Sequence, residues 1–236
     1  MRRKTTERRY KSRKRFLIPI FIVVLLITVF IANTIQTTDF FSFLMSSGPV
    51  ASTDHGWNLI LVNQNYRVPN NWDINLTELS NGQSVDSRIY PELQQMFNDA
   101  RAQGVYPVVA SGYRTSKKQQ ELTDEKVANF ISQGYSRSDA KTEALKWVSA
   151  VGYSEHQTGL AVDINADGVK STGQAVYDWL ANNAWKYGFI LRYPKDKTDI
   201  TGTSYEPWHY RYVGKEASAD IYTQKLCLEE YIDTLQ

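Results

Sequence analysis

The first feature of the hydrophobic pattern is a long apolar segment near the N-terminus. Residues 16–32 contain no charged side chain and consist mostly of Phe, Leu, Ile and Val. Continued to Ile35, this segment spans about 30 Å as a helix, which is the thickness of the hydrocarbon core of a bilayer. We therefore predict a transmembrane anchor at residues 16–35.

Beyond this segment, the apolar positions recur with the periods of helices and strands. A helix is predicted between Pro91 and Gly104, where apolar residues recur at i, i+3, i+4 and i+7. Residues 160–164 alternate Leu, Val and Ile with Ala161 and Asp163, which predicts a half-buried strand with its large side chains in the core. The same reasoning predicts further strands at 58–63, 105–110, 189–193 and 208–213, and further helices at 116–133, 137–151, 175–187 and 216–235.

The order of these elements predicts the fold class. Helices and strands are mixed without a regular βαβ alternation, and the sequence shows no internal repeat. Such an order favours an α+β fold with a central, largely antiparallel sheet flanked by helices, preceded here by one transmembrane helix. Residues 65–84 show no clear period and are predicted to be irregular.

Charge is distributed unevenly along the 236 residues. Residues 1–15 carry nine Lys and Arg against one Glu, a charge of +8, which leaves −6 for the rest of a chain whose net charge is +2. A body without an excess of basic residues argues against a nucleic-acid-binding domain. No Lys or Arg follows the apolar segment until Arg67. The positive-inside rule therefore places the N-terminus in the cytoplasm and the body on the outer side of the membrane.

These patterns divide the chain into a basic cytoplasmic tail at 1–15, the anchor at 16–35, a linker at 36–56 and an extracellular domain at 57–236. A cleaved signal peptide is the alternative for the apolar segment. The segment is longer than the usual core of about 7–15 residues, however, and no Ala-x-Ala site follows it. The single cysteine, Cys227, excludes an internal disulfide and a multi-cysteine zinc site, and we interpret it as a small buried apolar residue.

The three histidines are the candidates for metal chemistry. His55 lies in the predicted linker and is interpreted as a solvated residue. His156 stands seven residues before Asp163, whose strand neighbours are apolar, and a carboxylate in such surroundings requires a cation or several hydrogen bonds. Gly159 permits a turn that would bring His156 over the face of Asp163. His209 supplies a second imidazole near the other end of the chain.

Two imidazoles and one carboxylate, with a fourth position open, form the ligand set of a catalytic zinc site. The same set forms the facial triad of non-haem iron(II) enzymes, so the ligands alone do not select the metal. The predicted location disfavours a labile ferrous ion, and Glu206 favours hydrolysis because a carboxylate can take a proton from zinc-bound water. Residues 206 and 209 would point to opposite faces of an ideal strand. We hypothesise that a turn at Pro207 brings Glu206 toward the metal.

Three sequence blocks surround these residues. They are Ser111-Gly-Tyr-Arg-Thr115 followed by Gln119 and Leu122, then Ser154-x-His-x-x-Gly-x-Ala-x-Asp163, and then Glu206-Pro-Trp-His209. In content and order the blocks resemble those of the zinc D,D-carboxypeptidases of the VanY type, over roughly residues 57–214. The wider group includes D-Ala-D-Ala dipeptidases and the L,D-carboxypeptidases of peptidoglycan.

The resemblance implies a role for each matching residue. Glu206 would be the general base and then the general acid. Arg114 would stabilise the oxyanion, or would instead bind the terminal carboxylate of the substrate, and the sequence leaves these two roles open. Gln119 and Ser154 would hold the C-terminal D-residue of the peptide. The zinc ligands that the resemblance implies are His156, Asp163 and His209.

The predicted function is a membrane-anchored zinc carboxypeptidase that removes the C-terminal D-alanine from the stem peptides of peptidoglycan. L,D-Carboxypeptidase activity, which trims tetrapeptide stems, is the nearest alternative. The two activities differ in the stereochemistry of the residue before the cleaved bond, which depends on the shape of the pocket and is not revealed by the motifs. A non-catalytic, zinc-stabilised module that binds the cell wall is the alternative from another class. Glu206 argues against such a module, which needs no base beside its metal. The oligomeric state is left open by the sequence.

Overall fold

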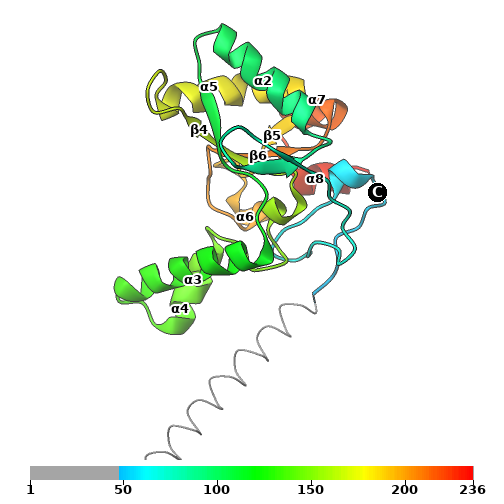
Figure 1. Ribbon diagram of the computed structural model, residues 1–236. Helices are drawn as coiled ribbons and strands as arrows, with labels where there is room; N and C mark the ends of the chain where they lie inside the picture. Colours follow the sequence, from blue (N-terminus) through cyan, green and yellow to red (C-terminus); the bar gives the residue numbers. More distant parts are fainter. Residues whose placement is uncertain (1–47, 236) are drawn as a thin grey trace, which may run out of the picture. The chain divides into compact units, whose positions relative to one another are not determined.

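The computed structural model describes residues 48–235 (Figure 1). The predicted cytoplasmic tail and transmembrane anchor, residues 1–35, lie outside the described residues, as does most of the predicted linker. Within residues 48–235, no helix has both the length and the apolar character that crossing a bilayer requires. The anchor therefore stays a prediction from the sequence.

A four-stranded antiparallel sheet lies at the centre of the described unit. Its strand order is β3-β4-β6-β5, so the two interior strands, β4 and β6, are neighbours although they are far apart in the sequence. The predicted α+β class and the antiparallel sheet are confirmed. The strands are β3 (Pro107–Ser111), β4 (Ala161–Ala166), β5 (Phe189–Leu191) and β6 (His209–Tyr212), and a one-turn helix, α6 (Thr198–Thr201), connects the last two.

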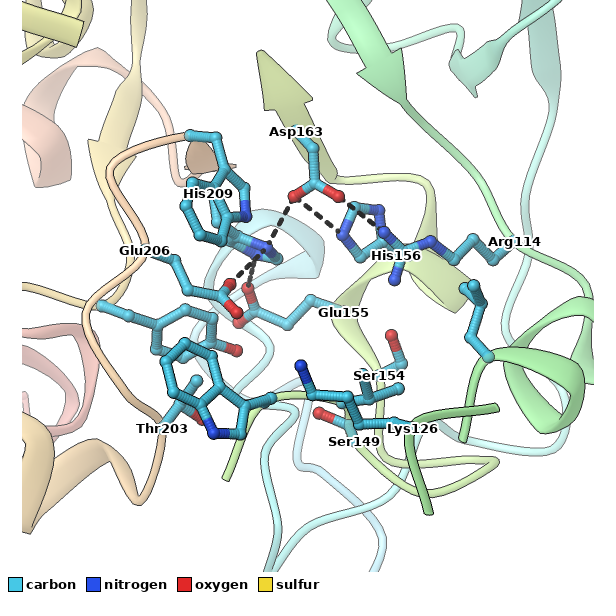
Figure 2. Close-up of a pocket in the computed structure, with 15 residues that line it drawn as sticks. Arg114, Lys126, Ser149, Ser154, Glu155, His156, Asp163, Thr203, Glu206 and His209 are labelled. Atoms are coloured by element: carbon cyan, nitrogen blue, oxygen red, sulfur yellow. Dashed lines mark hydrogen bonds and ion pairs between the residues drawn. The ribbon is translucent and has the colours of Figure 1, made fainter. Parts of the chain in front are cut away.

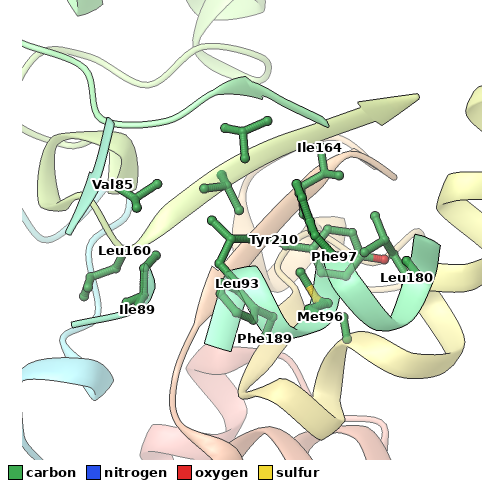
Figure 3. Packing of buried hydrophobic residues seen from close by; sticks show 14 of the residues in the cluster. Val85, Ile89, Leu93, Met96, Phe97, Leu160, Ile164, Leu180, Phe189 and Tyr210 are labelled. Carbon is green, nitrogen blue, oxygen red and sulfur yellow. The ribbon is translucent and has the colours of Figure 1, made fainter. Parts of the chain in front are cut away.

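Helices cover one face of this sheet, and Figure 1 shows α2, α5 and α7 on the same side of the strands. The alternate residues Leu160, Val162 and Ile164 are fully buried on this face, as the strand period predicted. Apolar residues of α2, among them Leu93 and Met96, pack against them (Figure 3). Each such buried side chain contributes roughly 1.5–3 kcal/mol to the core. The elements on this face are α2 (Tyr90–Ala102), α5 (Gly173–Asn183), η3 (Ala184–Tyr187) and α7 (Lys215–Gln224).

Two polar helices form a hairpin that extends from the opposite side of the sheet in Figure 1. They are α3 (Ser116–Ser132) and α4 (Arg137–Leu145). Each begins with a side-chain cap, because the hydroxyls of Thr115 and Ser136 accept a hydrogen bond from the backbone N–H three residues further on. The second helix ends at Leu145, six residues earlier than predicted. The residues that follow it turn toward the body of the domain and form one wall of the pocket described below.

The apolar run that begins at Asn58 is not a strand, in contrast to the prediction. It starts with a 3-10 turn, η1 (Trp57–Leu59), and the rest is irregular although Ile60 and Val62 are fully buried. The carbonyl groups of Asn58 and Ile60 accept hydrogen bonds of 3.1 and 2.8 Å from the guanidinium of Arg211. A side chain therefore satisfies buried backbone groups that would otherwise require a neighbouring strand.

The folded unit begins earlier than the predicted boundary at residue 57. Residues 48–56, the last part of the predicted linker, belong to the same compact unit as the body. Ala51 is buried, and its N–H donates to the carbonyl of Arg67 at 2.9 Å. The run of small and polar residues resembles a linker in composition, but its backbone is paired.

A small antiparallel hairpin occupies part of the stretch that was predicted to be irregular. Its strands are β1 (Leu76–Glu78) and β2 (Ser84–Asp86). Strands of three residues are too short for the alternation of apolar and polar positions to be recognised in a mostly polar segment. The extended conformation of each short strand is stabilised by its hydrogen bonds to the other strand.

The predicted helix at 216–235 consists of two helices, α7 and α8 (Leu228–Asp233). Lys225 ends α7 in the left-handed conformation, with a φ of 57°. Cys227 is buried, as predicted, and it begins α8 as the N-cap, where its N–H donates to the carboxylate of Glu230 at 2.8 Å. A lysine gives no sequence signal for a helix end that glycine usually marks.

Candidate metal centre

His156 is placed by a short 3-10 turn, η2 (Glu155–Thr158), which ends at Gly159 with a φ of 73°. The turn that the sequence indicated at this glycine is therefore present. The ring of His156 is buried, and its Nδ1 lies 2.8 Å from the carbonyl oxygen of Gly112. Because a carbonyl only accepts, Nδ1 carries the proton and the lone pair is on Nε2. Nε2 faces Oδ1 of Asp163 at 3.3 Å.

Strand pairing brings the second imidazole to the same carboxylate. Asp163 of β4 and His209 of β6 lie directly opposite each other in the register of the sheet. Nδ1 of His209 is 3.2 Å from Oδ1 of Asp163. On the other side of this ring, Nε2 lies 3.4 Å from Oε2 of Glu155, an acceptor for its proton. The lone pair of His209 is thereby directed at Asp163 as well.

Three ligand atoms converge at this point, as Figure 2 shows: Nε2 of His156, Oδ1 of Asp163 and Nδ1 of His209. They all lie within 4.8 Å of one another. Ligands that are about 2.0–2.1 Å from a tetrahedral ion are about 3.3 Å apart. This spacing matches the 3.3 and 3.2 Å that separate the two imidazoles from Oδ1. Lone pairs that face a common point are stabilised by a cation, so these residues fit a zinc ion.

The carboxylates around His209 also favour a positive charge at this site. Burial alone would lower the pKa of this imidazole, but the adjacent carboxylates of Asp163 and Glu155 outweigh burial and raise the pKa to about 9. Burial would likewise raise the pKa of Asp163, but the two imidazoles hold it well below its usual range. The negative charge of these carboxylates can be compensated by a proton on His209 or by a metal ion. A metal ion would bind the lone pairs of both imidazoles at the same time.

A second carboxyl group stands beside the three ligands. Glu206 precedes β6, and its carbonyl accepts a hydrogen bond of 3.2 Å from the N–H of His209, so the hypothesised turn at Pro207 is confirmed. The turn places Oε2 of Glu206 3.6 Å from Nδ1 of His209, in the wall of the pocket. Burial raises the pKa of Glu206 to about 7, against the lowering effect of His209. This carboxyl can therefore exchange a proton near neutral pH.

Arg114 contacts the other oxygen of the same aspartate. Its Nη2 donates to Oδ2 of Asp163 at 2.6 Å, and its Nε donates to the hydroxyl of Ser111 at 2.8 Å. The guanidinium thus fixes which carboxylate oxygen is left to face the imidazoles, a positioning role that the sequence did not indicate. Arg114 also lines the pocket, where it can reach a substrate.

The ligands lie in the wall of a pocket of about 350 Å³. Ser154 lines this pocket, where a substrate-binding residue was predicted. Gln119 is fully buried behind the wall, and its Nε2 donates to the carbonyl of Ser149, a lining residue, at 2.7 Å. The substrate-binding role of both residues stays a prediction. The lining residues are Arg114, Leu122, Lys126, Trp147, Val148, Ser149, Ser154, Glu155, His156, Asp163, Tyr193, Thr203, Glu206, Trp208 and His209.

The sequence reasoning missed a set of buried charges behind the ligands. The side chain of Glu155 is fully buried, and its Oε1 accepts hydrogen bonds of 2.8 Å from both Arg192 and Arg211. Glu155 carried no signal of its own, because a Glu beside a polar turn is most often solvated. Arg192 did carry one, since a charge inside the apolar run 189–193 must be paired if that run is buried.

Gly159→Ala is expected to destabilise the domain by about 2–4 kcal/mol. An L-residue in the left-handed region costs about 1–2 kcal/mol. The added Cβ would also lie 3.0 Å from the backbone nitrogen of Asp86, which cannot move away without shifting the chain, and 2.8 Å from Cδ1 of Ile74, which would have to change its position. Gly134→Ala is the matched control, because its φ is 95° but a Cβ there meets no atom within 4 Å. Urea unfolding measures both, and equal losses would contradict the steric argument.

Three converging ligands with a carboxyl group beside them, Glu206, are the arrangement of a metal-dependent hydrolase. A family model described as VanY, D-alanyl-D-alanine carboxypeptidase, matches residues 82–215, which is more than half of the chain. The chain belongs to this family, and the resemblance identified from the three sequence blocks is confirmed.

Individual relatives agree with this assignment. A curated D-alanyl-D-alanine carboxypeptidase from Enterococcus faecalis is 61% identical over 178 residues, which are 75% of this chain and 66%, just under two thirds, of that protein. The crystal structure of a mutant of the vancomycin-resistance D,D-pentapeptidase VanY, in complex with Zn(II), is 60% identical with a TM-score of 0.73, and covers 75% of this chain and 99% of its own. The structure of VanYB in complex with D-alanine-D-alanine is also 60% identical, with a TM-score of 0.75 and coverage of 76% and 99%.

Proposed function

We propose that this protein is a zinc-dependent D,D-carboxypeptidase that removes the C-terminal D-alanine from peptidoglycan stem peptides. The observation that carries the proposal is the convergence of His156, Asp163 and His209: their ligand atoms lie within 4.8 Å of one another, and both imidazoles are 3.2–3.3 Å from Oδ1 of Asp163. The complexes of the two solved VanY structures with Zn(II) and with D-alanine-D-alanine support the same metal and the same substrate class.

The residues of the site divide the chemistry between them. A zinc ion held by His156, Asp163 and His209 would supply the Lewis acid that makes water reactive at neutral pH. Glu206 accepts a proton from the attacking water on its carboxylate and passes it to the nitrogen of the leaving D-alanine. Arg114 keeps its Nη1 group for the carbonyl oxygen, where negative charge develops during attack. The burial of Glu206 and Arg114 strengthens both interactions, because the pocket wall excludes water from them.

Ser154 and Gln119 remain the candidates for holding the C-terminal D-residue. Ser154 is buried in the pocket wall directly before η2, so a substrate there would lie within one residue of the turn that carries His156. Gln119 would act through the position of the Ser149 carbonyl, to which it donates. Both roles place substrate recognition on the wall that joins the α3–α4 hairpin to the sheet.

The activity is tested on the full-length chain in detergent, with pentapeptide and tetrapeptide stems as substrates. We expect one zinc ion per chain, release of D-alanine from the pentapeptide, loss of this release after chelation, and its recovery when zinc is returned. Cleavage of the tetrapeptide alone would replace the D,D assignment by the L,D alternative. If the zinc-loaded chain cleaves neither peptide, the interpretation as a non-catalytic module that binds the cell wall would replace the proposed function.

The location at the membrane is a separate part of the proposal. Residues 16–35 anchor the chain, residues 1–15 lie in the cytoplasm and the catalytic domain lies outside the cell, as the apolar length and the charge imbalance favour. Tethering raises the concentration of the enzyme near a polymeric substrate. The full-length chain should sediment with membranes, and protease added to intact protoplasts should release the domain. A chain that remains soluble, or a domain protected from the protease, would contradict the topology.

A further inference from the structure

A chain of buried charges leads from His209 to the last helix of the protein. Glu155 provides its first step, because Oε2 of this carboxylate lies 3.4 Å from Nε2 of His209. The other oxygen, Oε1, accepts from Nε of Arg192 and from Nη1 of Arg211, both at 2.8 Å. The side chains of Glu155 and of both arginines are fully buried.

The second step connects Arg192 to α8. Its Nη1 and Nη2 donate to the two carboxylate oxygens of Glu229 at 2.8 and 2.7 Å, a bidentate pair of the strong, geometrically specific kind. All three nitrogens of this guanidinium therefore bind one of two carboxylates, Nε to Glu155 and the others to Glu229. Nδ2 of Asn63 also donates to Oε1 of Glu229, at 3.1 Å.

The charges in this cluster balance only when Glu229 is included. Glu155 and Glu229 are negative, and Arg192 and Arg211 are positive. Without Glu229, two buried guanidiniums would share the single carboxylate of Glu155, and Arg192 would lose two of its three hydrogen bonds. Arg192 would then compete with His209 for the oxygens of Glu155, because an unpaired buried charge is strongly unfavourable.

We propose that Glu229 is a positioning residue for the metal centre: it holds Arg192, which orients Glu155, which in turn keeps Nδ1 of His209 directed at the ligand point. This inference rests on the zinc site proposed above. Glu229 follows Glu155 by about 70 residues in the sequence. It lies in α8, outside the region 82–215 that the family model matches.

The consequence is a change in metal binding and not only in stability. Groups that hydrogen-bond to a metal-bound histidine typically alter metal affinity by 10- to 100-fold when they are removed. Glu229 acts one step further away, through Arg192, so we expect Glu229→Gln to weaken zinc binding about 10-fold, at the lower end of that range. Glutamine keeps the size of the side chain but offers one acceptor oxygen and no charge.

Glu230→Gln is the matched control on the same helix. Glu230 is also a carboxylate of α8 in an ion pair, but its partner is Lys197, at 2.9 Å, on the more exposed side of the helix. The experiment measures zinc affinity of the full-length chain by competition with a chelator, and the visible absorption of the cobalt(II)-substituted chain. We expect a weaker affinity and a shifted cobalt spectrum for Glu229→Gln, and wild-type values within about twofold for Glu230→Gln.

A milder variant covers the case in which Glu229→Gln does not fold. Asn63→Asp keeps the acceptor oxygen that receives the N–H groups of residues 65 and 66, but replaces the donor to Glu229 by a like charge. A smaller loss of zinc affinity with the same direction of spectral shift supports the proposal.

The outcomes separate this inference from the function on which it rests. Unchanged zinc affinity and an unchanged cobalt spectrum in the folded Glu229 or Asn63 variant would overturn the positioning role while the zinc site stands. An equal loss in Glu230→Gln would also overturn it, because the effect would then belong to helix stability. A wild-type chain that binds no zinc would overturn both proposals.

Discussion

Replacing Glu206 with glutamine is expected to reduce the turnover of pentapeptide by at least about 100-fold, while the chain keeps its fold and its zinc. Glutamine has nearly the same size but cannot take a proton from water at neutral pH. Zinc binding should persist, because the ligand point is formed by His156, Asp163 and His209 without Glu206. The base stands beside this point, with Oε2 3.6 Å from Nδ1 of His209.

The comparison requires kcat for D-alanine release, the zinc content and a far-ultraviolet spectrum for each variant. Glu121→Gln is the control, since Glu121 is an exposed carboxylate of α3 that forms only a long ion pair, 3.9 Å, with the exposed Lys118. It should have wild-type turnover. A Glu206→Gln chain with normal kcat would show that another group accepts the proton, and the mechanism proposed here would be wrong.

Glu155→Gln is expected to destabilise the domain by about 3–5 kcal/mol, the cost of leaving buried charge without its partner. The variant leaves Arg192 and Arg211 without the carboxylate that both contact at 2.8 Å. Burial alone would raise the pKa of Glu155, but Arg192 and Arg211 outweigh burial and hold it well below its usual range. A depressed pKa of this kind stabilises the fold at neutral pH, and the stabilisation is lost as the pH falls toward the folded-state pKa.

Urea unfolding at neutral pH, followed by tryptophan fluorescence on the metal-free chain, measures this loss. Glu143→Gln is the control, because Glu143 also pairs with a cation, Lys146 at 2.7 Å, but on the surface, where such pairs contribute about 0–1 kcal/mol. If Glu155→Gln costs no more than Glu143→Gln, the buried cluster does not stabilise the fold as argued. The metal-free chain is used so that lost zinc binding does not add to the difference.

The parts of the fold that the sequence predicted are those whose signal is local. The helix between Pro91 and Gly104 was identified because one face of it is apolar at helical spacing, and the structure buries that face against the sheet. The alternation at 160–164 likewise gave the strand and the face on which Asp163 lies. The hydrophobic period and the Pro and Gly residues at the ends of an element are properties of consecutive residues. They can be recognised without knowing which other segment the element packs against.

Two errors in the predicted fold have physical causes that the residue pattern does not record. The run that begins at Asn58 looks like a strand, but the guanidinium of Arg211, about 150 residues away, pairs with its carbonyl groups. The break between α7 and α8 occurs at Lys225, which adopts a φ of 57°. A lysine in the sequence does not indicate a helix end. At Asn58 a distant residue overrides the local preference of the chain, whereas at Lys225 the backbone turns through local hydrogen bonds to Tyr222 and Ile221.

By itself the sequence determined the α+β class, the identity of the ligand candidates and the presence of a base near one of them, because the content and order of the three motif blocks can be read from the linear sequence. Only the tertiary structure decided their geometry: the pairing of Asp163 with His209 across two strands, and the carbonyl of Gly112 that orients His156. It alone revealed Glu155 as a buried partner of the site. Lone-pair direction and charge compensation depend on atoms that are distant in the chain, so no local pattern records them.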